Sequence, residues 1–252
     1  MKLRFLVATT ASLFLYYGAS AAEIKVLAPG ATKEVYLDLV PQFEQSSGYT
    51  VVTTWSGTAD IKKRMAAGEV YDVVIVGAPD IDAFITQGKV ASGSRIDLMK
   101  SGVGVAVRAG APKPDISSSE ALKRTLLAAR AISYSDPAAG GASGIYFAKL
   151  LERLGIADEV NAKTKYPPPA GLCGDLLVSG DAELAVQQKP ELLQVPGIEI
   201  LGLLPGELHM VTVFVACLEA SSAQSATGQA LIDFLRSPAS AAVFRAKGLD
   251  PA

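Results

Sequence analysis

Hydrophobic and polar positions along this chain follow two alternating patterns. Short runs of β-branched and aliphatic residues, such as residues 23–28, indicate strands. Between such runs, apolar residues recur at helical spacing, as Val35, Leu39 and Phe43 do within residues 33–46. Strand and helix segments that follow one another in this order favour a parallel sheet covered by helices on both faces.

The same two patterns continue to the end of the sequence. Further strands are predicted at residues 49–54, 71–77, 102–110, 131–135, 183–188, 198–204 and 210–218. Further helices are predicted at residues 60–67, 80–87, 120–129, 143–154, 172–179, 225–235 and 239–247. The fold class is therefore α/β.

The strand and helix pattern restarts near the middle of the chain, which predicts two α/β lobes. Two long β-rich runs, residues 103–107 and 211–218, are candidates to cross between them. We expect residues 22–102 and 219–252 to form the first lobe and residues 103–218 the second. A ligand cleft is expected between the two sheets.

The N-terminus has the pattern of a secretory signal peptide. MKLR supplies positive charge, an apolar run follows, and small residues at 18–21 precede a cleavage site after Ala21 or Ala22. The apolar run is shorter than the roughly 20 residues that a membrane-spanning helix needs. We therefore predict that residues 1–21 are removed and that the mature protein is exported to the periplasm without spanning a membrane.

Composition narrows the class of function. Half of the residues are hydrophobic (50%) and 19% are charged, which is typical of a well-packed globular protein. The formal net charge of -2 and the pI near 5.5 leave no basic surplus, so we expect no nucleic-acid partner. We expect a monomer.

The cysteines and the single histidine limit the chemistry further. Cys173 and Cys217 form either one disulfide or two buried thiols, and the sequence leaves both alternatives open. There is no CxxC pair, and His209 is the only histidine, so we expect neither a metal nor a cofactor. The GGASG run lacks the lysine of a phosphate-binding loop, and no G-x-S-x-G hydrolase motif occurs.

Small or hydroxylated residues separate a strand from a helix at four places. These corners are residues 29–32, 56–59, 140–144 and 171–174. Each exposes backbone N–H groups without intrahelical partners at the positive end of a helix dipole, and missing side chains let a ligand approach. With two corners in each predicted lobe, we predict a shared anion site; ordinary turns and caps are the alternative.

The chain resembles the periplasmic molybdate-binding protein family, the type II solute receptors of ABC transporters. The resemblance rests on residues 28–32, FEQSSGYTVVTTWSGTADIKKRMAAGEVYDVVIVGAP, AISYSDPAAGGASGIYFAKLLERLGI, VSGDAELAV and ALIDFLRSPASAAVFRAKGL. It implies a two-lobed periplasmic-binding-protein fold, each lobe a mixed sheet flanked by helices, with two crossing hinge strands. It also implies a small anionic ligand, held as the lobes close, and an ABC permease as partner.

Several binding positions differ from the family pattern. Ala31 stands where the family has a serine, Gly57 and Thr58 replace a serine pair, and Gln188 falls where the family has a tyrosine. Losing these donors would leave molybdate underpaired in a closed cleft. The GAPKPDIS and SDPAAGGASG segments are similar to a divergent branch that includes periplasmic aconitate isomerase, which implies a carboxylate ligand as an alternative to an oxyanion.

Two functional hypotheses follow. The first is a binding protein for a small anion, with these candidate ligand-binding residues: Gly30, Ala31, Thr32, Gly57, Thr58, Ala142, Ser143, Leu172, Cys173 and Gln188. The second is an isomerase that moves a proton on an unsaturated tricarboxylate. For this reaction Lys33 and Lys189 are candidate carboxylate clamps, and Glu34, Tyr146 and Cys173 are candidate bases.

Overall fold

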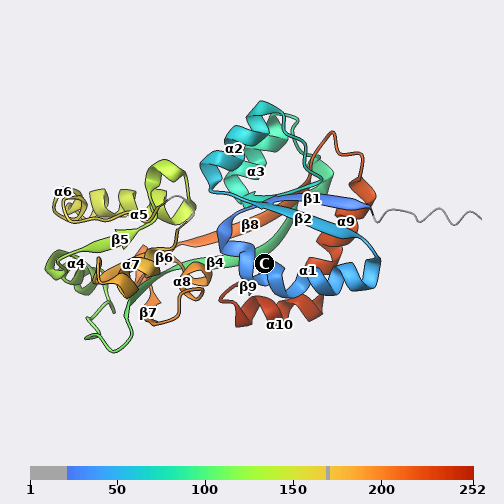
Figure 1. Ribbon diagram of the computed structural model, residues 1–252. Coiled ribbons are helices and arrows are strands. Elements are labelled where there is room, and N and C mark those ends of the chain that lie inside the picture. The colour runs from blue at the N-terminus through green and yellow to red at the C-terminus, as the bar shows by residue number, and fades with distance from the viewer. Residues whose placement is uncertain (1–21, 169–170) are drawn as a thin grey trace, which may run out of the picture.

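The computed structural model describes residues 22–168 and 171–252. The predicted signal peptide, residues 1–21, lies outside the described residues. The rest of the chain forms two lobes, each a sheet flanked by helices, and the long strands β4 (Ile96–Arg108) and β8 (Val211–Leu218) run between them (Figure 1). This two-lobed arrangement confirms the fold class predicted from the sequence.

The first lobe is built on a parallel trio of strands. Its elements are β1 (Glu23–Ala28), β2 (Thr50–Trp55), β3 (Val73–Gly77), α1 (Lys33–Ser47), α2 (Thr58–Ala67), α3 (Ala78–Thr86), α9 (Ser225–Leu235) and α10 (Pro238–Ala246). β1 pairs in parallel with both β2 and β3. Val35, Leu39 and Phe43 of α1 are buried in the core, as their helical spacing predicts. The carboxyl ends of these strands, and the turns that follow them, therefore share one edge of the sheet.

The second lobe has its own sheet and its own core. Its elements are β5 (Ile132–Tyr134), β6 (Leu184–Gln188), β7 (Ile198–Leu203), α4 (Ser119–Ala128), α5 (Ala142–Arg153), α6 (Ala157–Asn161), α7 (Cys173–Ser179) and α8 (Lys189–Leu192). β5 pairs in parallel with β6, while β6 and β7 run antiparallel to β4. Phe147, Leu150 and Leu151 of α5 are buried in this core.

β4 belongs to both sheets. Its residues 96–102 pair with β8, and β9 (Asp250–Pro251) adds to the same half, whereas residues 103–108 pair with β6 and β7. The sequence pattern placed the start of this strand at Gly102; the structure starts it at Ile96, because the half-polar run before Gly102 pairs with β8. The lobe boundaries stay a prediction, although β8 pairs throughout with first-lobe strands.

The two cysteines lie in different lobes. Cys173 is in the second-lobe core and Cys217 is in the first-lobe core, and both are buried and free. The structure therefore supports two buried thiols over a disulfide between them.

Short elements were the ones that the hydrophobic pattern missed. The unpredicted ones include α6, α8, β9 and the 3₁₀ turns η1 (Gly30–Thr32), η2 (Ser92–Ser94), η3 (Pro137–Ala139) and η4 (Gly206–Leu208). α8 follows β6 without a loop and is too short for helical periodicity, although Pro190 in its first turn is typical of a helix start. Among the helices of residues 22–168 and 171–252, none is long and apolar enough to cross a membrane.

Candidate functional site

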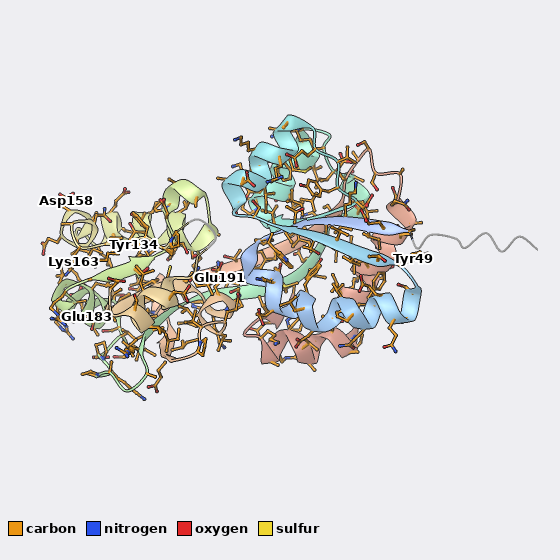
Figure 2. The ribbon with its side chains drawn as sticks, viewed as in Figure 1. Tyr49, Tyr134, Asp158, Lys163, Glu183 and Glu191 are labelled. Carbon is orange, nitrogen blue, oxygen red and sulfur yellow. The ribbon has the colours of Figure 1, made fainter. Side chains whose placement is uncertain are left out.

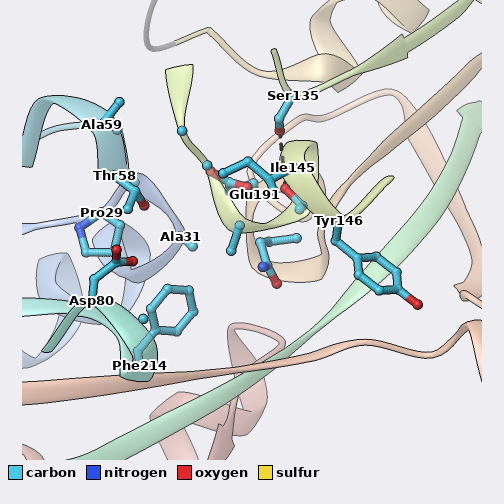
Figure 3. A pocket seen from close by; sticks show the side chains of 18 of the residues that line it. Pro29, Ala31, Thr58, Ala59, Asp80, Ser135, Ile145, Tyr146, Glu191 and Phe214 are labelled. Carbon is cyan, nitrogen blue, oxygen red and sulfur yellow. Dashed lines mark hydrogen bonds between the residues drawn. The ribbon is translucent and has the colours of Figure 1, made fainter. Parts of the chain in front are cut away.

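A cavity of about 650 Å³ lies between the two lobes. Figure 3 shows the first-lobe residues Pro29, Thr58 and Asp80 on one side of it and the second-lobe residues Ile145 and Glu191 on the other. The cavity therefore lies where the turns that follow the first-lobe strands meet α5 and α8 of the second lobe.

The lobes touch on both sides of this cavity. Gly140 (φ 74°) lies so close to α2 that a Cβ at this position would be 2.6 Å from the Cβ of Ala59. A Cβ at Gly57 would be 3.1 Å from the carbonyl oxygen of Ala139. Across the cavity, α8 packs against η1. The structure is therefore a closed form, in which the cavity is bounded by both lobes.

Two helices from opposite lobes begin at the cavity. Gly57 precedes α2 and Gly141 precedes α5, and neither supplies a side-chain hydrogen bond to the first turn of its helix. The helices begin at Thr58 and Ala142, which both line the cavity. Because the first N–H groups of a helix lack intrahelical partners and carry the positive end of its dipole, the two helix starts favour a negative charge between them.

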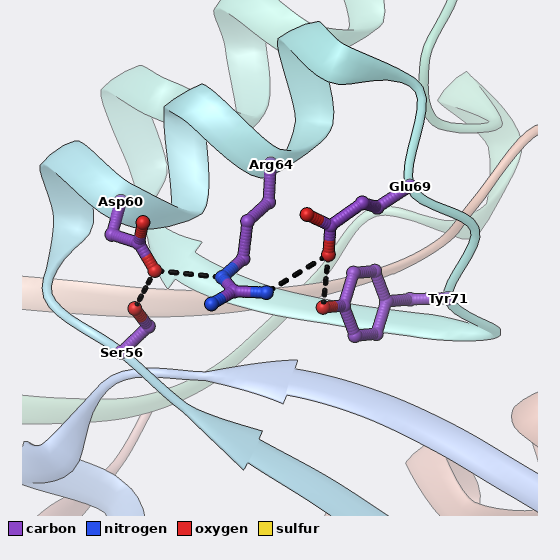
Figure 4. A network of polar contacts seen from close by, with 5 residues as sticks. All are labelled: Ser56, Asp60, Arg64, Glu69 and Tyr71. Carbon is purple, nitrogen blue, oxygen red and sulfur yellow. Dashed lines mark hydrogen bonds and ion pairs between the residues drawn. The ribbon is translucent and has the colours of Figure 1, made fainter.

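A polar network fixes the α2 corner (Figure 4). The Ser56 hydroxyl donates to the carboxylate of Asp60, and Arg64 Nε donates to the same carboxylate at 2.7 Å. Glu69 accepts from both Arg64 (2.9 Å) and the Tyr71 hydroxyl (2.9 Å). The hydrogen bonds from Ser56 and Arg64 hold the pKa of Asp60 below its usual value. Ser56 lines the cavity, but its hydrogen atom is already engaged in holding α2 in place.

The α5 corner depends on close backbone packing. A Cβ at Gly144 would lie 2.2 Å from the carbonyl oxygen of Ser135, so only glycine lets α5 approach β5 this closely. The hydroxyls of Ser135 and Ser143 are 3.3 Å apart, and both residues line the cavity. This pair places two hydroxyl groups beside the start of α5.

The structure brings together most of the predicted site. The predicted residues that line the cavity are Gly30, Ala31, Gly57, Thr58, Ala142, Ser143 and Gln188. Thr32, Leu172 and Cys173 are not among its lining residues. The Thr32 hydroxyl donates to the Pro29 carbonyl (2.9 Å), and the Cys173 N–H donates to Gln187 Oε1 (2.9 Å). That the lining residues contact a ligand stays a prediction.

Cys173 is not suited to nucleophilic chemistry. Its side chain is fully buried (0% exposed) in the second-lobe core. Burial raises the pKa of its thiol to about 12, so the thiolate is scarce at neutral pH.

Gln188 presents an incompletely bonded amide to the cavity. It is 3% exposed, its Nε2 donates to Thr212 Oγ1 at 2.7 Å, and its Oε1 has no hydrogen-bond partner among the described residues. If the amide is turned by 180°, the Thr212 hydroxyl donates to Oε1, and Nε2 takes the unpaired position. In that orientation the unpaired position of Gln188, which is buried at the edge of the cavity, carries an N–H donor instead of an acceptor.

The charged side chains at the cavity include both signs. Lys62 and Asp80 form an ion pair at 3.3 Å, with side chains that are 57% and 23% exposed. Lys149 adds a second cation from α5. Lys33 and Lys189, the predicted clamps, do not line the cavity as the described residues form it. In the described part of the chain, no group of three or more His, Cys, Asp or Glu side chains could hold a metal ion.

Glu191 is a titratable cavity residue that sequence reasoning missed, as it missed Asp80 and Lys149. It lies on α8 at the junction of the two lobes (Figure 2), and one of its carboxyl oxygens is 3.7 Å from where a Cβ on Gly30 would be. Burial raises the pKa of Glu191 to about 7, and hydrogen bonds from the Gln188 backbone and the Gln187 side chain oppose this rise only in part. The signal that could have found it is the Lys189-Pro190-Glu191 sequence directly after a buried strand.

Comparisons with known proteins agree with this geometry. A family model described as bacterial extracellular solute-binding protein matches residues 24–250. The aconitate isomerase of a Pseudomonas species is 33% identical over 234 residues, which cover 90% of this chain and 87% of that protein. The molybdate-binding protein ModA of Escherichia coli (strain K12) is 24% identical over 233 residues, covering 91% and 90%. The solved structure of the Azotobacter vinelandii periplasmic molybdate-binding protein superposes with a TM-score of 0.74 at 21% identity, covering 90% of this chain and 98% of that one.

Proposed function

Because the chain belongs to the bacterial extracellular solute-binding protein family, we propose that it binds a small organic carboxylate between its lobes for uptake by an ABC transporter. It acts in the periplasm after removal of residues 1–21. Cell fractionation of strains that express the full chain or residues 22–252 tests the location: only the full chain is expected in the periplasm.

The observation that carries the proposal is the convergence of α2 and α5 on one cavity. These helices come from different lobes, and their uncapped first turns point to the same space. An anion held there interacts favourably with both helix dipoles at once, and only when the lobes are closed. Ligand binding therefore stabilises the closed form, which is the form that a transporter distinguishes from an empty receptor.

The volume of the cavity favours an organic acid over an oxyanion. If each heavy atom takes about the 30 Å³ of a liquid water molecule, the cavity has room for roughly 20 heavy atoms. On the same scale, a tetrahedral oxyanion fills about a quarter of this space and a six-carbon tricarboxylate about 60% of it. Ala31 and Gln188 also supply no hydroxyl to a compact ion. A larger carboxylate can reach both helix starts and Gln188 together.

An isomerase of an unsaturated tricarboxylate is the second candidate function. It is favoured by the match to aconitate isomerase over most of both chains and by a carboxyl group, Glu191, that lies in the cavity with a pKa of about 7. A proton shift needs a base whose pKa is near the working pH, and a receptor does not need such a group.

A ligand screen tests the first proposal. Purified protein is melted with molybdate, sulfate, tricarballylate, or cis- or trans-aconitate, since a ligand of the folded state raises the melting temperature. We expect the tricarboxylates to give the largest shifts. A larger shift with molybdate would contradict the argument from volume, and no shift with any of these anions would contradict the anion site itself.

A turnover assay separates the two candidate functions. The protein is incubated with cis-aconitate, and the trans isomer is measured by proton NMR. Conversion supports the isomerase. Tight binding of cis-aconitate without conversion supports the receptor alone.

A further inference from the structure

Glu191 is a carboxyl group of the cavity that the binding function does not use. We propose that Glu191 is the catalytic residue that removes and returns the proton when an unsaturated carboxylate isomerises in this cavity, and that Gln187 positions it. This inference rests on the second candidate function. The substrate class is a carboxylate with an acidic C–H between a carboxylate group and a carbon–carbon double bond.

The position of α8 brings the Glu191 carboxyl to the cavity. α8 begins directly after β6, so its first turn is held by the buried strand, and Pro190 sets the backbone at that turn. The Glu191 carboxyl faces Gly30 of the opposite lobe, with one oxygen 3.7 Å from where a Cβ on Gly30 would be. The carboxyl is therefore in reach of a ligand held between the lobes, on the opposite side of the cavity from Asp80 (Figure 3).

Gln187 links the start of α7 to this carboxyl. Its Oε1 accepts the Cys173 N–H at 2.9 Å, which settles the orientation of the amide, because an Nε2 group cannot accept that hydrogen bond. The other end of the amide, Nε2, is left for the Glu191 carboxyl, whose pKa the Gln187 side chain lowers. Gln187 is 4% exposed, so the link is protected from water. The corner at residues 171–174 thus acts on the cavity indirectly, because its Cys173 N–H orients Gln187, the residue proposed to position Glu191.

Other acidic or basic groups at the cavity are less suited to remove a proton from carbon. Asp80 is paired with Lys62 at 3.3 Å, so its carboxylate already has a cationic partner. The Tyr146 hydroxyl donates to the Leu208 carbonyl at 3.0 Å. Lys149 is a candidate carboxylate clamp.

The candidate bases from the sequence do not reach the cavity either. Glu34 lies 3.9 Å from Lys247 at the end of α10 and is not a lining residue. Cys173 is fully buried below the cavity surface. Glu191 is therefore the carboxyl that combines a place in the cavity with the lack of a cationic partner among the ion pairs of the described residues.

The proton shift balances with one carboxyl group. The Glu191 carboxylate takes a proton from the methylene carbon, and the C–H electron pair forms a new double bond to the central carbon. The former double bond gives its electron pair to the far carbon, which takes the same proton back from Glu191. The negative charge that develops between these steps spreads onto the substrate carboxylates, where the first N–H groups of α2 and α5 stabilise it. Burial raises the pKa of Glu191 to about 7, which suits both taking and returning a proton at neutral pH.

Glu191→Gln tests the catalytic role. The wild-type protein and the variant are incubated with cis-aconitate in D₂O, while trans-aconitate formation and deuterium at the exchanging carbons are followed by proton NMR. Tricarballylate, which is saturated and cannot isomerise, measures binding. We expect the variant to bind tricarballylate within about threefold of wild type and to lose at least 100-fold in turnover and exchange. Glu34→Gln is the matched control and should keep wild-type turnover.

The outcomes separate this inference from the function on which it rests. Wild-type protein that binds tricarboxylates without any turnover or exchange overturns the isomerase and, with it, the role of Glu191, but leaves the receptor standing. Wild-type turnover with less than a tenfold loss in Glu191→Gln overturns the role of Glu191 alone. Loss of tricarballylate binding in Glu191→Gln also overturns it, because the residue would then hold the ligand and not move its proton.

Gln187→Glu tests the positioning role. The replacement keeps an oxygen for the Cys173 N–H but turns the donor towards Glu191 into a second carboxyl oxygen. We expect the rising limb of the pH–rate profile to move to higher pH, because the hydrogen bond that lowers the pKa of Glu191 is lost. A profile with an unchanged midpoint would contradict the positioning role, even if the rate fell at every pH.

Discussion

The first-lobe wall and the second-lobe wall of the cavity both present the start of a helix, but their carboxyl groups lie in different environments. Each wall presents the uncapped start of a helix, α2 in the first lobe and α5 in the second. Each also presents a carboxyl group, Asp80 from the first lobe and Glu191 from the second. Asp80 is paired with Lys62, whereas burial without a cationic partner raises the pKa of Glu191 to about 7.

This difference shows that environment, not residue type, decides what a carboxyl group does. A carboxylate beside an ammonium group stays charged, and a carboxyl taken out of water holds its proton more tightly. The first-lobe wall therefore carries an ion pair, while the second-lobe wall carries a carboxyl group with a pKa of about 7.

Preventing full closure of the two lobes should have the largest effect on ligand affinity. Gly140→Ala places a Cβ 2.6 Å from the Ala59 Cβ and 2.7 Å from the Ala59 nitrogen, so the lobes cannot close fully. A ligand then loses contacts with one wall, and two hydrogen bonds to a charged ligand are worth about 3–6 kcal/mol together. We expect tricarballylate affinity to fall at least 100-fold, measured by calorimetry.

A second glycine provides the matched control for this change. Gly110 also has a positive φ (78°), but no atom lies within 4 Å of a Cβ built there. Alanine in this backbone region costs about 1 kcal/mol wherever it occurs, so Gly110→Ala and Gly140→Ala should lose similar stability. If Gly110→Ala weakened binding as much as Gly140→Ala, closure would not be the cause.

Removing the titrating group should change how stability depends on pH. The pKa of Glu191 is raised in the folded protein to about 7 from 4.5, so between these values the folded state holds more proton than the unfolded state. Its contribution to stability is therefore complete below about pH 4.5 and is lost as pH rises through 7. Since each unit of pKa is worth about 1.4 kcal/mol, Glu191→Gln should be up to about 3 kcal/mol more stable than wild type at pH 8.

Urea unfolding at pH 4.5 and pH 8 measures this effect. The difference between Glu191→Gln and wild type should be small at the lower pH and large at the higher one. An equal difference at both values would show that the Glu191 carboxyl does not change its protonation between them, and the contrast between the two walls would disappear.

The sequence predicted the strands, helices and turns around this site better than the titratable side chains within it. The strands that end at Ala28 and Trp55 carry strong β-branched patterns, and the helices after them have clear apolar spacing, so the turns between them could be placed. Seven of the ten predicted binding residues are on such turns or at the end of β6, and they line the cavity.

The residues that sequence reasoning placed wrongly, or missed, depend on tertiary contacts. Cys173 begins α7 just as Thr58 begins α2, but its N–H meets Gln187 and not the cavity. Glu191 sits on a helix of four residues, which has no periodicity to detect. Its raised pKa comes from burial among segments that are distant in the sequence, which no local pattern encodes.

Removing the Gln188 amide of the second-lobe wall should have an intermediate effect on ligand affinity. Gln188→Leu keeps the approximate volume but leaves an anion without the N–H that Gln188 can offer once Thr212 donates to its Oε1. A hydrogen bond to a charged group is worth about 1.5–3 kcal/mol, so tricarballylate affinity should fall by roughly 10- to 100-fold.

Thr212→Val is the companion variant for Gln188. It removes the partner of the amide and keeps the amide itself, so we expect a smaller loss of affinity than in Gln188→Leu. Binding by Gln188→Leu that equals wild type would show that the ligand does not use this side chain.

Removing the Asp80 carboxyl of the first-lobe wall should have the smallest effect on stability and on ligand affinity. Asp80→Asn breaks the ion pair with Lys62, but a pair this exposed contributes only about 0–1 kcal/mol, so the change in stability should be within about 1 kcal/mol at both pH 4.5 and pH 8. The same change removes one negative charge from the cavity and frees Lys62, so anion affinity should rise by about threefold and the gain should shrink at high salt. Calorimetry in low and high salt measures this. Weaker tricarboxylate binding by Asp80→Asn would mean that Asp80 accepts a hydrogen bond from the ligand. The first lobe would then recognise the ligand through the Asp80 carboxylate as well as through the start of α2.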